Sequence, residues 1–279
     1  MNTEYKLSGK AGNLFLVGTL LGPALITLLC IIYAYIDIYN PLIYFTVVVF
    51  LGLLFGILIV QKLVIRLAKC RDTSSAVIYG LVVGVFGVYA NWCTFVYVFI
   101  RKEDYPVELM NLMANPVMIF DFASALSVDG YFTLFGITIK GGLLWLLWIV
   151  EAIGIMAAGA LGGLAVMHEE IFCEECNRWA EDTKFNLRLA IEYQDEAKKM
   201  IESDIEKILD FPIHEGAKTE HIRVNLHQCS TCQNTATIDV DLISYKTNDK
   251  GEVSEKAADF SNVYILNKSQ YNRFMNKKN

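Results

Sequence analysis

Two pairs of cysteines carry the clearest chemistry in this sequence. Cys173-Glu-Glu-Cys176 and Cys229-Ser-Thr-Cys232 each place two thiols on one tight turn. A structural zinc ion takes four tetrahedral ligands, and two such turns supply four thiolates and leave no open position for water. We therefore predict a structural Zn²⁺ site formed by Cys173, Cys176, Cys229 and Cys232.

A redox dithiol and a set of unrelated thiols are the competing interpretations. A redox CxxC normally opens a helix in a thioredoxin-like pattern, which this sequence lacks. His168, His221 and His227 are candidates to replace one thiolate, although core or surface histidines are commoner. The run His168-Glu-Glu lacks the second histidine of a zinc hydrolase. Since no nucleophile–base motif or phosphate-binding loop is evident either, we do not expect an enzyme.

Alternating apolar and polar residues flank the second cysteine pair. Such period-two patterns predict strands over about 221–227 and 236–245, and a third short strand is expected over about 261–266. A cysteine turn between two strands resembles the knuckle of a zinc ribbon, over residues 172–243. The resemblance is partial, because more than fifty residues separate the two turns, whereas about fifteen to twenty are usual.

The residues between the two turns account for this extra length. Residues 180–210 contain good helix formers, no proline or glycine, and apolar positions spaced mostly by three or four. This spacing predicts one long helix, or a broken pair of helices, with an apolar face. The helix would be an insertion in the zinc-ribbon-like module, and its apolar face would pack on that module or on a second copy.

The apolar residues are concentrated before Met167. Overall, 54% of the 279 residues are apolar and only 19% are charged, and a bilayer crossing needs about 20 apolar residues. Four runs are long enough: 13–36, 41–66, 75–100 and 142–167. The predicted fold is therefore an α-helical membrane protein, with a four-helix transmembrane bundle in residues 1–168 and a small α+β cytosolic domain in residues 169–279.

Positive residues indicate the orientation of the bundle. Lys6 and Lys10 precede the first span, and the junction between the second and third spans carries four more: Lys62, Arg66, Lys69 and Arg71. Because positive residues favour the cytoplasmic side, both ends of the chain are expected in the cytoplasm. Arg101 and Lys102 oppose this, but two acids follow them. The abundance of Asn, Lys, Ile and Tyr favours a bacterial inner (plasma) membrane.

Glu151 is a carboxylate about ten residues into the fourth span. A charge at that depth costs at least a few kcal/mol unless it is protonated or paired. Glu151 either lies on an ion or proton path or in a polar contact between helices, with Asn91 of the third span as a candidate partner. Alternatively, the span begins later and Glu151 is interfacial. Both interpretations remain open.

Two further features of the predicted bundle allow two interpretations each. The outer connection 101–140 contains helix and hairpin signals, and it is either a lid on the helix ends or a functional gate. Glycines recur at small-residue spacing in Gly52/Gly56, Gly80/Gly84 and Gly159/Gly163. They permit close helix packing, either within one bundle or in a homo-oligomer.

The charge balance limits the classes of partner. A net charge of −6 and the absence of a basic patch argue against nucleic acid. We expect a membrane-anchored interaction, scaffold or regulatory protein, with the lipid bilayer and an unidentified cytosolic or membrane protein as partners. The alternative is a small channel or transporter that uses Glu151 in the membrane and the zinc domain as its regulator.

Overall fold

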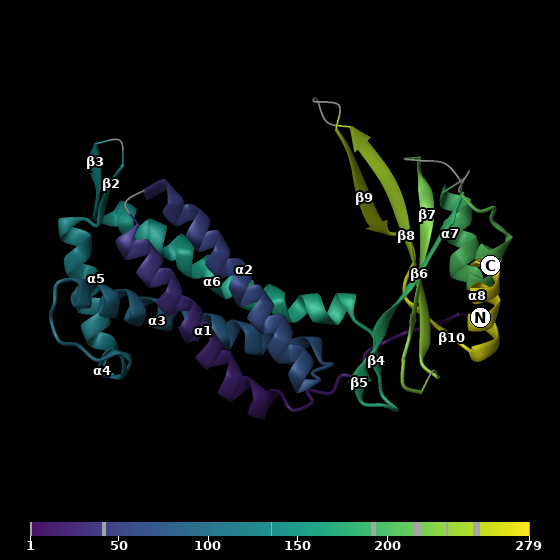
Figure 1. Ribbon diagram of the computed structural model, residues 1–279, viewed down its shortest axis with the longest axis horizontal. Coiled ribbons are helices and arrows are strands. Elements are labelled where there is room, and N and C mark those ends of the chain that lie inside the picture. The colour runs from purple at the N-terminus through teal and green to yellow at the C-terminus, as the bar shows by residue number, and fades with distance from the viewer. Residues whose placement is uncertain are drawn as a thin grey trace. The chain divides into compact units, whose positions relative to one another are not determined.

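The computed structural model describes residues 2–40, 43–134, 136–190, 194–214, 219–232, 234–247 and 252–278. The chain divides into two compact units (Figure 1). The bundle unit is Ser8–Glu169, and the sheet unit combines Met1–Leu7 with Glu170–Asn279. The first residues therefore belong to the sheet unit and not to the predicted transmembrane domain 1–168, because residues 3 and 4 pair with a strand near the other end of the chain.

Four long apolar helices build the bundle unit: α1 (Leu14–Tyr39), α2 (Ile43–Ala68), α3 (Thr73–Lys102) and α6 (Gly142–Glu169). All four are long and apolar enough to cross a membrane, as the sequence predicted. Residues 41 and 42, the predicted start of the second span, lie outside the described residues. Both α1 and α6 pack against α2 and α3, so α1 and α6 occupy diagonal positions in the bundle.

Glycines bring α3 and α6 into backbone contact. A Cβ added at Gly80 would lie 2.3 Å from the carbonyl oxygen of Gly159, and one added at Gly163 would lie 2.8 Å from that of Ala76. These glycines therefore serve helix packing within the chain. Gly52 differs, because among the described residues no atom lies within 4 Å of a Cβ placed there.

The connection between α3 and α6 contains four short elements: α4 (Leu109–Met113), α5 (Pro116–Asp129), β2 (Phe132–Leu134) and β3 (Ile137–Ile139). Asn115 caps α5 by accepting a hydrogen bond from the Met118 N–H at 3.4 Å, and Pro116 occupies the first turn. Gly130, at φ 88°, ends α5 and leads into the β2–β3 hairpin. Residue 135 of this predicted outer connection lies outside the described residues.

The sheet unit is built on one antiparallel sheet. Its strands are β1 (Thr3–Glu4), β6 (Glu181–Leu189), β7 (His221–Gln228), β8 (Ala236–Thr247), β9 (Val253–Asp259) and β10 (Tyr264–Leu266). The spatial order is β1-β10-β8-β7-β6, and β9 also pairs with β8, further along that strand than β10 does. Both strands around the second cysteine turn thus lie inside the sheet.

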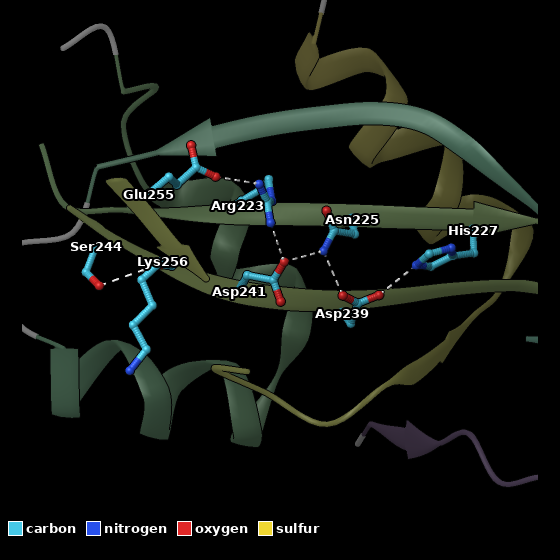
Figure 2. Close-up of polar contacts among 8 residues, drawn as sticks. All are labelled: Arg223, Asn225, His227, Asp239, Asp241, Ser244, Glu255 and Lys256. Atoms are coloured by element: carbon cyan, nitrogen blue, oxygen red, sulfur yellow. Dashed lines mark hydrogen bonds and ion pairs between the residues drawn. The ribbon is translucent and has the colours of Figure 1, made fainter. Parts of the chain in front are cut away.

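One face of this sheet carries the core and the other is polar. The core face packs against three helical segments: α7 (Gln194–Ser203), the 3₁₀ helix η1 (Ile205–Asp210) and α8 (Lys268–Lys278). The polar face is a chain of cross-strand contacts (Figure 2), in which Arg223 binds Asp241 and Glu255 while Asn225 joins Asp241 to Asp239. The alternation in β7 and β8 produces this division.

The prediction of a long helix or a broken pair of helices over 180–210 is wrong for the first part of this stretch. Its first part is strand β6, residues 191–193 lie outside the described residues, and only the remainder is helical, as α7 and η1. Leu187 and Leu189 are buried on either side of the exposed Arg188, which is the period of a strand. Pairing with β7 outweighs the helix propensity of this stretch.

Candidate metal centre and buried carboxylates

Each cysteine pair lies on a turn between two strands. Cys173 and Cys176 belong to a small hairpin formed by β4 (Phe172–Cys173) and β5 (Arg178–Trp179). Asn177 adopts φ 50° in this turn, a left-handed conformation that asparagine tolerates better than most residues. Cys229 and Cys232 lie in the loop between β7 and β8. The sheet therefore presents one pair, and a separate hairpin presents the other.

The four thiols converge. Their sulfur atoms all lie within 4.8 Å of one another, and the Sγ atoms of Cys173 and Cys232 are 3.5 Å apart. A zinc ion bound at about 2.3 Å to four sulfurs separates them by about 3.8 Å. All four are free cysteines, so the cluster has the donor type and the spacing that a tetrahedral metal site requires.

Hydrogen bonds support the cluster from both turns. The Thr235 hydroxyl donates to Cys173 Sγ at 3.2 Å, and the Cys229 N–H donates to the Thr235 carbonyl oxygen at 2.9 Å. Thr235 thus ties the second turn to a sulfur of the first. The guanidinium of Arg178 donates to the Thr231 hydroxyl at 2.8 Å, which adds a cross-link beside the thiols.

The surroundings shift the pKa values of Cys229 and Cys176 in opposite directions. Burial disfavours the Cys229 thiolate, but backbone N–H groups of Cys232 and Thr231 and the neighbouring thiols lower the pKa of Cys229 to about 6. Burial and hydrogen bonds to the other three cysteines raise the pKa of Cys176 to about 12. Hydrogen bonds within the cluster thus favour the thiolate form at Cys229, which is the form that binds metal.

The histidines considered as alternative ligands lie elsewhere. Among the described residues, the cluster with metal-binding spacing consists of the four cysteines alone. The His221 ring is buried and stacks on that of His214, with 4.8 Å between ring centroids. His227 Nε2 contacts Asp239 Oδ1 at 2.8 Å on the polar face of the sheet (Figure 2). The His168 side chain lies outside the described part of the structure.

Glu151 of α6 contacts Asn91 of α3, the partner that the sequence offered as a candidate. The Asn91 side-chain N–H donates to Glu151 Oε1 at 3.1 Å, and the Tyr33 hydroxyl also forms a hydrogen bond with Glu151. Because Tyr33 belongs to α1, diagonally opposite α6, this contact places the Glu151 carboxylate between the helices. The Asn91 side-chain oxygen is buried and has no hydrogen-bond partner among the described residues.

A second carboxylate in the bundle unit was missed from the sequence. Asp37 accepts hydrogen bonds from Thr46 at 2.9 Å and from the Tyr131 hydroxyl at 3.1 Å. Tyr131 belongs to the connection between α5 and β2, so that connection reaches the end of α1. Asp37 directly follows the predicted first span 13–36, and one of its two partners, Tyr131, lies far along the chain.

Comparisons with known proteins add no constraint to this assignment. The chain matches no protein-family model, no curated protein sequence and no solved structure. The likeness to a zinc ribbon therefore rests on the four cysteines and on the strands around them.

Proposed function

We propose that this chain is an integral membrane protein whose sheet unit is a zinc-thiolate module with an interaction, scaffold or regulatory role. The convergence of four thiols from two distant turns carries this proposal. Four thiolates suit Zn²⁺ and fill its coordination shell, so the ion would stabilise structure and not activate water. It would join the β4–β5 hairpin to the β7–β8 loop.

The helices support the membrane assignment. Many large apolar side chains of α1, α2 and α6 are exposed, for example Phe15, Phe55 and Ile153. Such an apolar surface suits lipid contact. The pairing of Thr3 with Ile265 supports an even number of crossings, because segments before α1 and after α6 then share one side. The positive residues beside α2 favour the cytoplasm for that side.

The surface of the sheet unit supports a polar, reversible contact with a partner protein. Among the side chains that the structure describes in this unit, the exposed large apolar residues are Met200, Ile213, Val253 and Ile265, each on a different segment. Obligate interfaces are more apolar than this. The edge strand β9 is exposed along its whole length, and among the described strands it pairs with β8 alone. Such an edge accepts an added strand.

A pull-down from native membranes in mild detergent tests this role. The wild-type chain is compared with Cys229→Ser/Cys232→Ser and with Cys93→Ser, which changes a buried cysteine of the bundle unit. We expect a stoichiometric partner with the wild type and Cys93→Ser that is lost from the double variant. A partner retained by the double variant, or no partner in any sample, would contradict the interaction role.

A channel or transporter is the second candidate function, and the environment of Glu151 favours it. The Glu151 carboxylate lies between helices and forms hydrogen bonds with Asn91 and Tyr33. The Asp37 carboxylate accepts a hydrogen bond from Tyr131. Acidic side chains that face the interior of a membrane bundle commonly mark ion or proton paths. In this role, the connection containing Tyr131 would act as the outer gate and the zinc module as regulator.

Flux measurements in liposomes distinguish this second function. Proton and sodium flux are compared for the wild type, Glu151→Gln and Asp121→Asn, a control at an exposed position of α5. We expect Glu151→Gln to abolish flux with unchanged helix content, and Asp121→Asn to retain it. Equal flux in the wild type and Glu151→Gln would remove Glu151 from the mechanism, and the absence of wild-type flux would remove the function.

A further inference from the structure

The residues before α1 form an anchored segment of the sheet unit. We call this segment, Asn2–Tyr5, the N-terminal strap. The Asn2 side chain donates to the carbonyl oxygens of Ile201 at 2.8 Å and Glu202 at 3.2 Å, and it accepts from the Ile205 N–H at 2.9 Å. Asn2 thus satisfies backbone groups where α7 ends and η1 begins.

The other end of the strap reaches the metal centre. The Tyr5 N–H donates to the Val263 carbonyl oxygen at 2.9 Å, which continues the pairing of β1 with β10. The Tyr5 hydroxyl accepts from the Phe172 N–H at 2.8 Å and donates to the Phe172 carbonyl oxygen at 3.2 Å. Phe172 directly precedes Cys173, so Tyr5 holds both backbone polar groups of the residue that leads into the first thiol.

We propose that the N-terminal strap is a positioning element of the metal centre, and that strap docking and metal occupancy stabilise each other. The inference rests on the proposed zinc site. Groups outside the ligand shell commonly orient the ligands, and their loss weakens metal binding. Here Tyr5 restrains the backbone of the β4–β5 hairpin, which carries two of the four thiols. By linkage, a strap that strengthens metal binding is itself held more firmly when metal is bound.

Through the strap, the metal centre is linked along the chain to the first long helix as well as to the last. The chain runs from Tyr5 through a short segment to α1, which begins at Leu14, and it runs from the end of α6 at Glu169 almost directly to Cys173. Release of metal would therefore weaken the docking of two segments, the one that leads into α1 and the one that follows α6. This is a means by which a metal module could regulate a membrane bundle.

The rate of zinc release tests the proposal in the full-length protein. Zinc-loaded protein in detergent is mixed with a colorimetric chelator, and release is followed for Tyr5→Phe, Asn2→Ala and Tyr271→Phe. Tyr271 is a buried tyrosine of α8, and its variant controls for the loss of a hydroxyl from the core of the sheet unit. We expect Tyr5→Phe to release zinc about tenfold faster, the effect of about 1.4 kcal/mol. Asn2→Ala should also accelerate release, whereas Tyr271→Phe should match the wild type.

The outcomes separate this inference from the zinc site itself. Zinc content and thermal unfolding are measured first, and if Tyr5→Phe fails to fold, Asn2→Ala decides the matter because Asn2 makes no described contact with the cysteine hairpin. One zinc per chain with release rates equal to the wild type in both variants would overturn the strap's role alone. Equal acceleration in Tyr271→Phe would do the same. A wild-type protein that binds no zinc would overturn the proposed site.

Discussion

At the scale of single residues, the four thiols should act as one unit. Replacing Cys173 by serine leaves three ligands in a site that needs four, and metal-binding energy is folding energy in a small module. We expect Cys173→Ser to lose zinc and to destabilise the sheet unit by about 4 kcal/mol or more. Thermal unfolding followed by circular dichroism, together with the zinc content, measures both effects.

Cys93→Ser provides the matched control for that change. Cys93 is also a free, buried cysteine, but it lies in α3 of the bundle unit. It should leave zinc content and the unfolding of the sheet unit unchanged. A Cys173→Ser protein with wild-type zinc content and stability would show that the thiols are unrelated to folding.

Asp72 should make the stability of the bundle unit depend on pH. Its carboxylate accepts a 2.8 Å hydrogen bond from the Ser75 N–H at the start of α3, and hydrogen bonds from the Ser75 side chain and backbone lower the pKa of Asp72 below its usual value of 3.8. The folded state therefore binds this proton less readily than the unfolded state. The cap stabilises the fold fully above the usual pKa and is lost as pH falls through the lowered pKa.

Thermal unfolding in detergent across that acidic range tests this sign. Asp72→Asn retains a capping oxygen but cannot titrate, so the loss of stability on acidification should be smaller in Asp72→Asn than in the wild type. An identical pH dependence in the two proteins would exclude Asp72 as its source.

The predictability of these sites depended on the distance between partners. The CxxC spacing gives each thiol pair directly, and the depth of Glu151 in an apolar run made Asn91 a candidate partner. Asn2, Tyr5 and Asp37 carry no such local signal. Asn2 and Tyr5 bond to residues far away in sequence, as with Tyr5 and Phe172. Asp37 bonds to the nearby Thr46 but also to the distant Tyr131, so only the folded chain reveals the full set of contacts.

At the scale of elements, the contact between α3 and α6 should depend on the absence of side chains. A methyl group at Gly80 would lie 2.3 Å from the Gly159 carbonyl oxygen, a backbone atom that cannot move aside alone. We expect Gly80→Ala to destabilise the bundle unit by about 1–3 kcal/mol. Unfolding of the detergent-solubilised protein measures this.

Gly52→Ala is the control within the same set of predicted glycine pairs. Space is open around Gly52 among the described residues, and alanine favours the helix, so this change should be neutral or slightly stabilising. Equal destabilisation by the two substitutions would contradict the close contact of α3 with α6.

Elements were predicted best where one periodicity dominates. Long apolar runs indicate four membrane-length helices, and the alternation around Cys229 indicates β7 and β8. Strand β6 was missed because residues 180–210 combine a strand and two short helical segments within one charged stretch. Strand β9 is exposed throughout, so it lacks the apolar alternation that marks a half-buried strand.

At the scale of the whole molecule, the sheet unit combines Met1–Leu7 with Glu170–Asn279. These two segments precede and follow the four long helices in the sequence. No local pattern in residues 2–7 predicts this, because β1 has only two residues and its partner is β10. If the four helices cross a membrane, this pairing requires the segments before α1 and after α6 to lie on the same side of it. The pairing then constrains the orientation independently of the positive residues.

Labelling of single introduced cysteines tests that arrangement in intact cells. A membrane-impermeant thiol reagent should label a cysteine at Thr138, an exposed position of the β2–β3 hairpin, and should not label one at Ser254, an exposed position of β9. Lysed cells, in which both positions should react, are the control. Labelling of Ser254→Cys in intact cells would reverse the orientation, and labelling of both would contradict four crossings.

The most direct test of the account is zinc K-edge X-ray absorption on the full-length protein purified without added metal. The convergence of Cys173, Cys176, Cys229 and Cys232 predicts one zinc per chain, surrounded by four sulfur atoms at about 2.3 Å with no nitrogen or oxygen ligand. A protein without zinc, or a zinc ion with fewer than four sulfur neighbours, would contradict the closed thiolate site on which the proposed function rests.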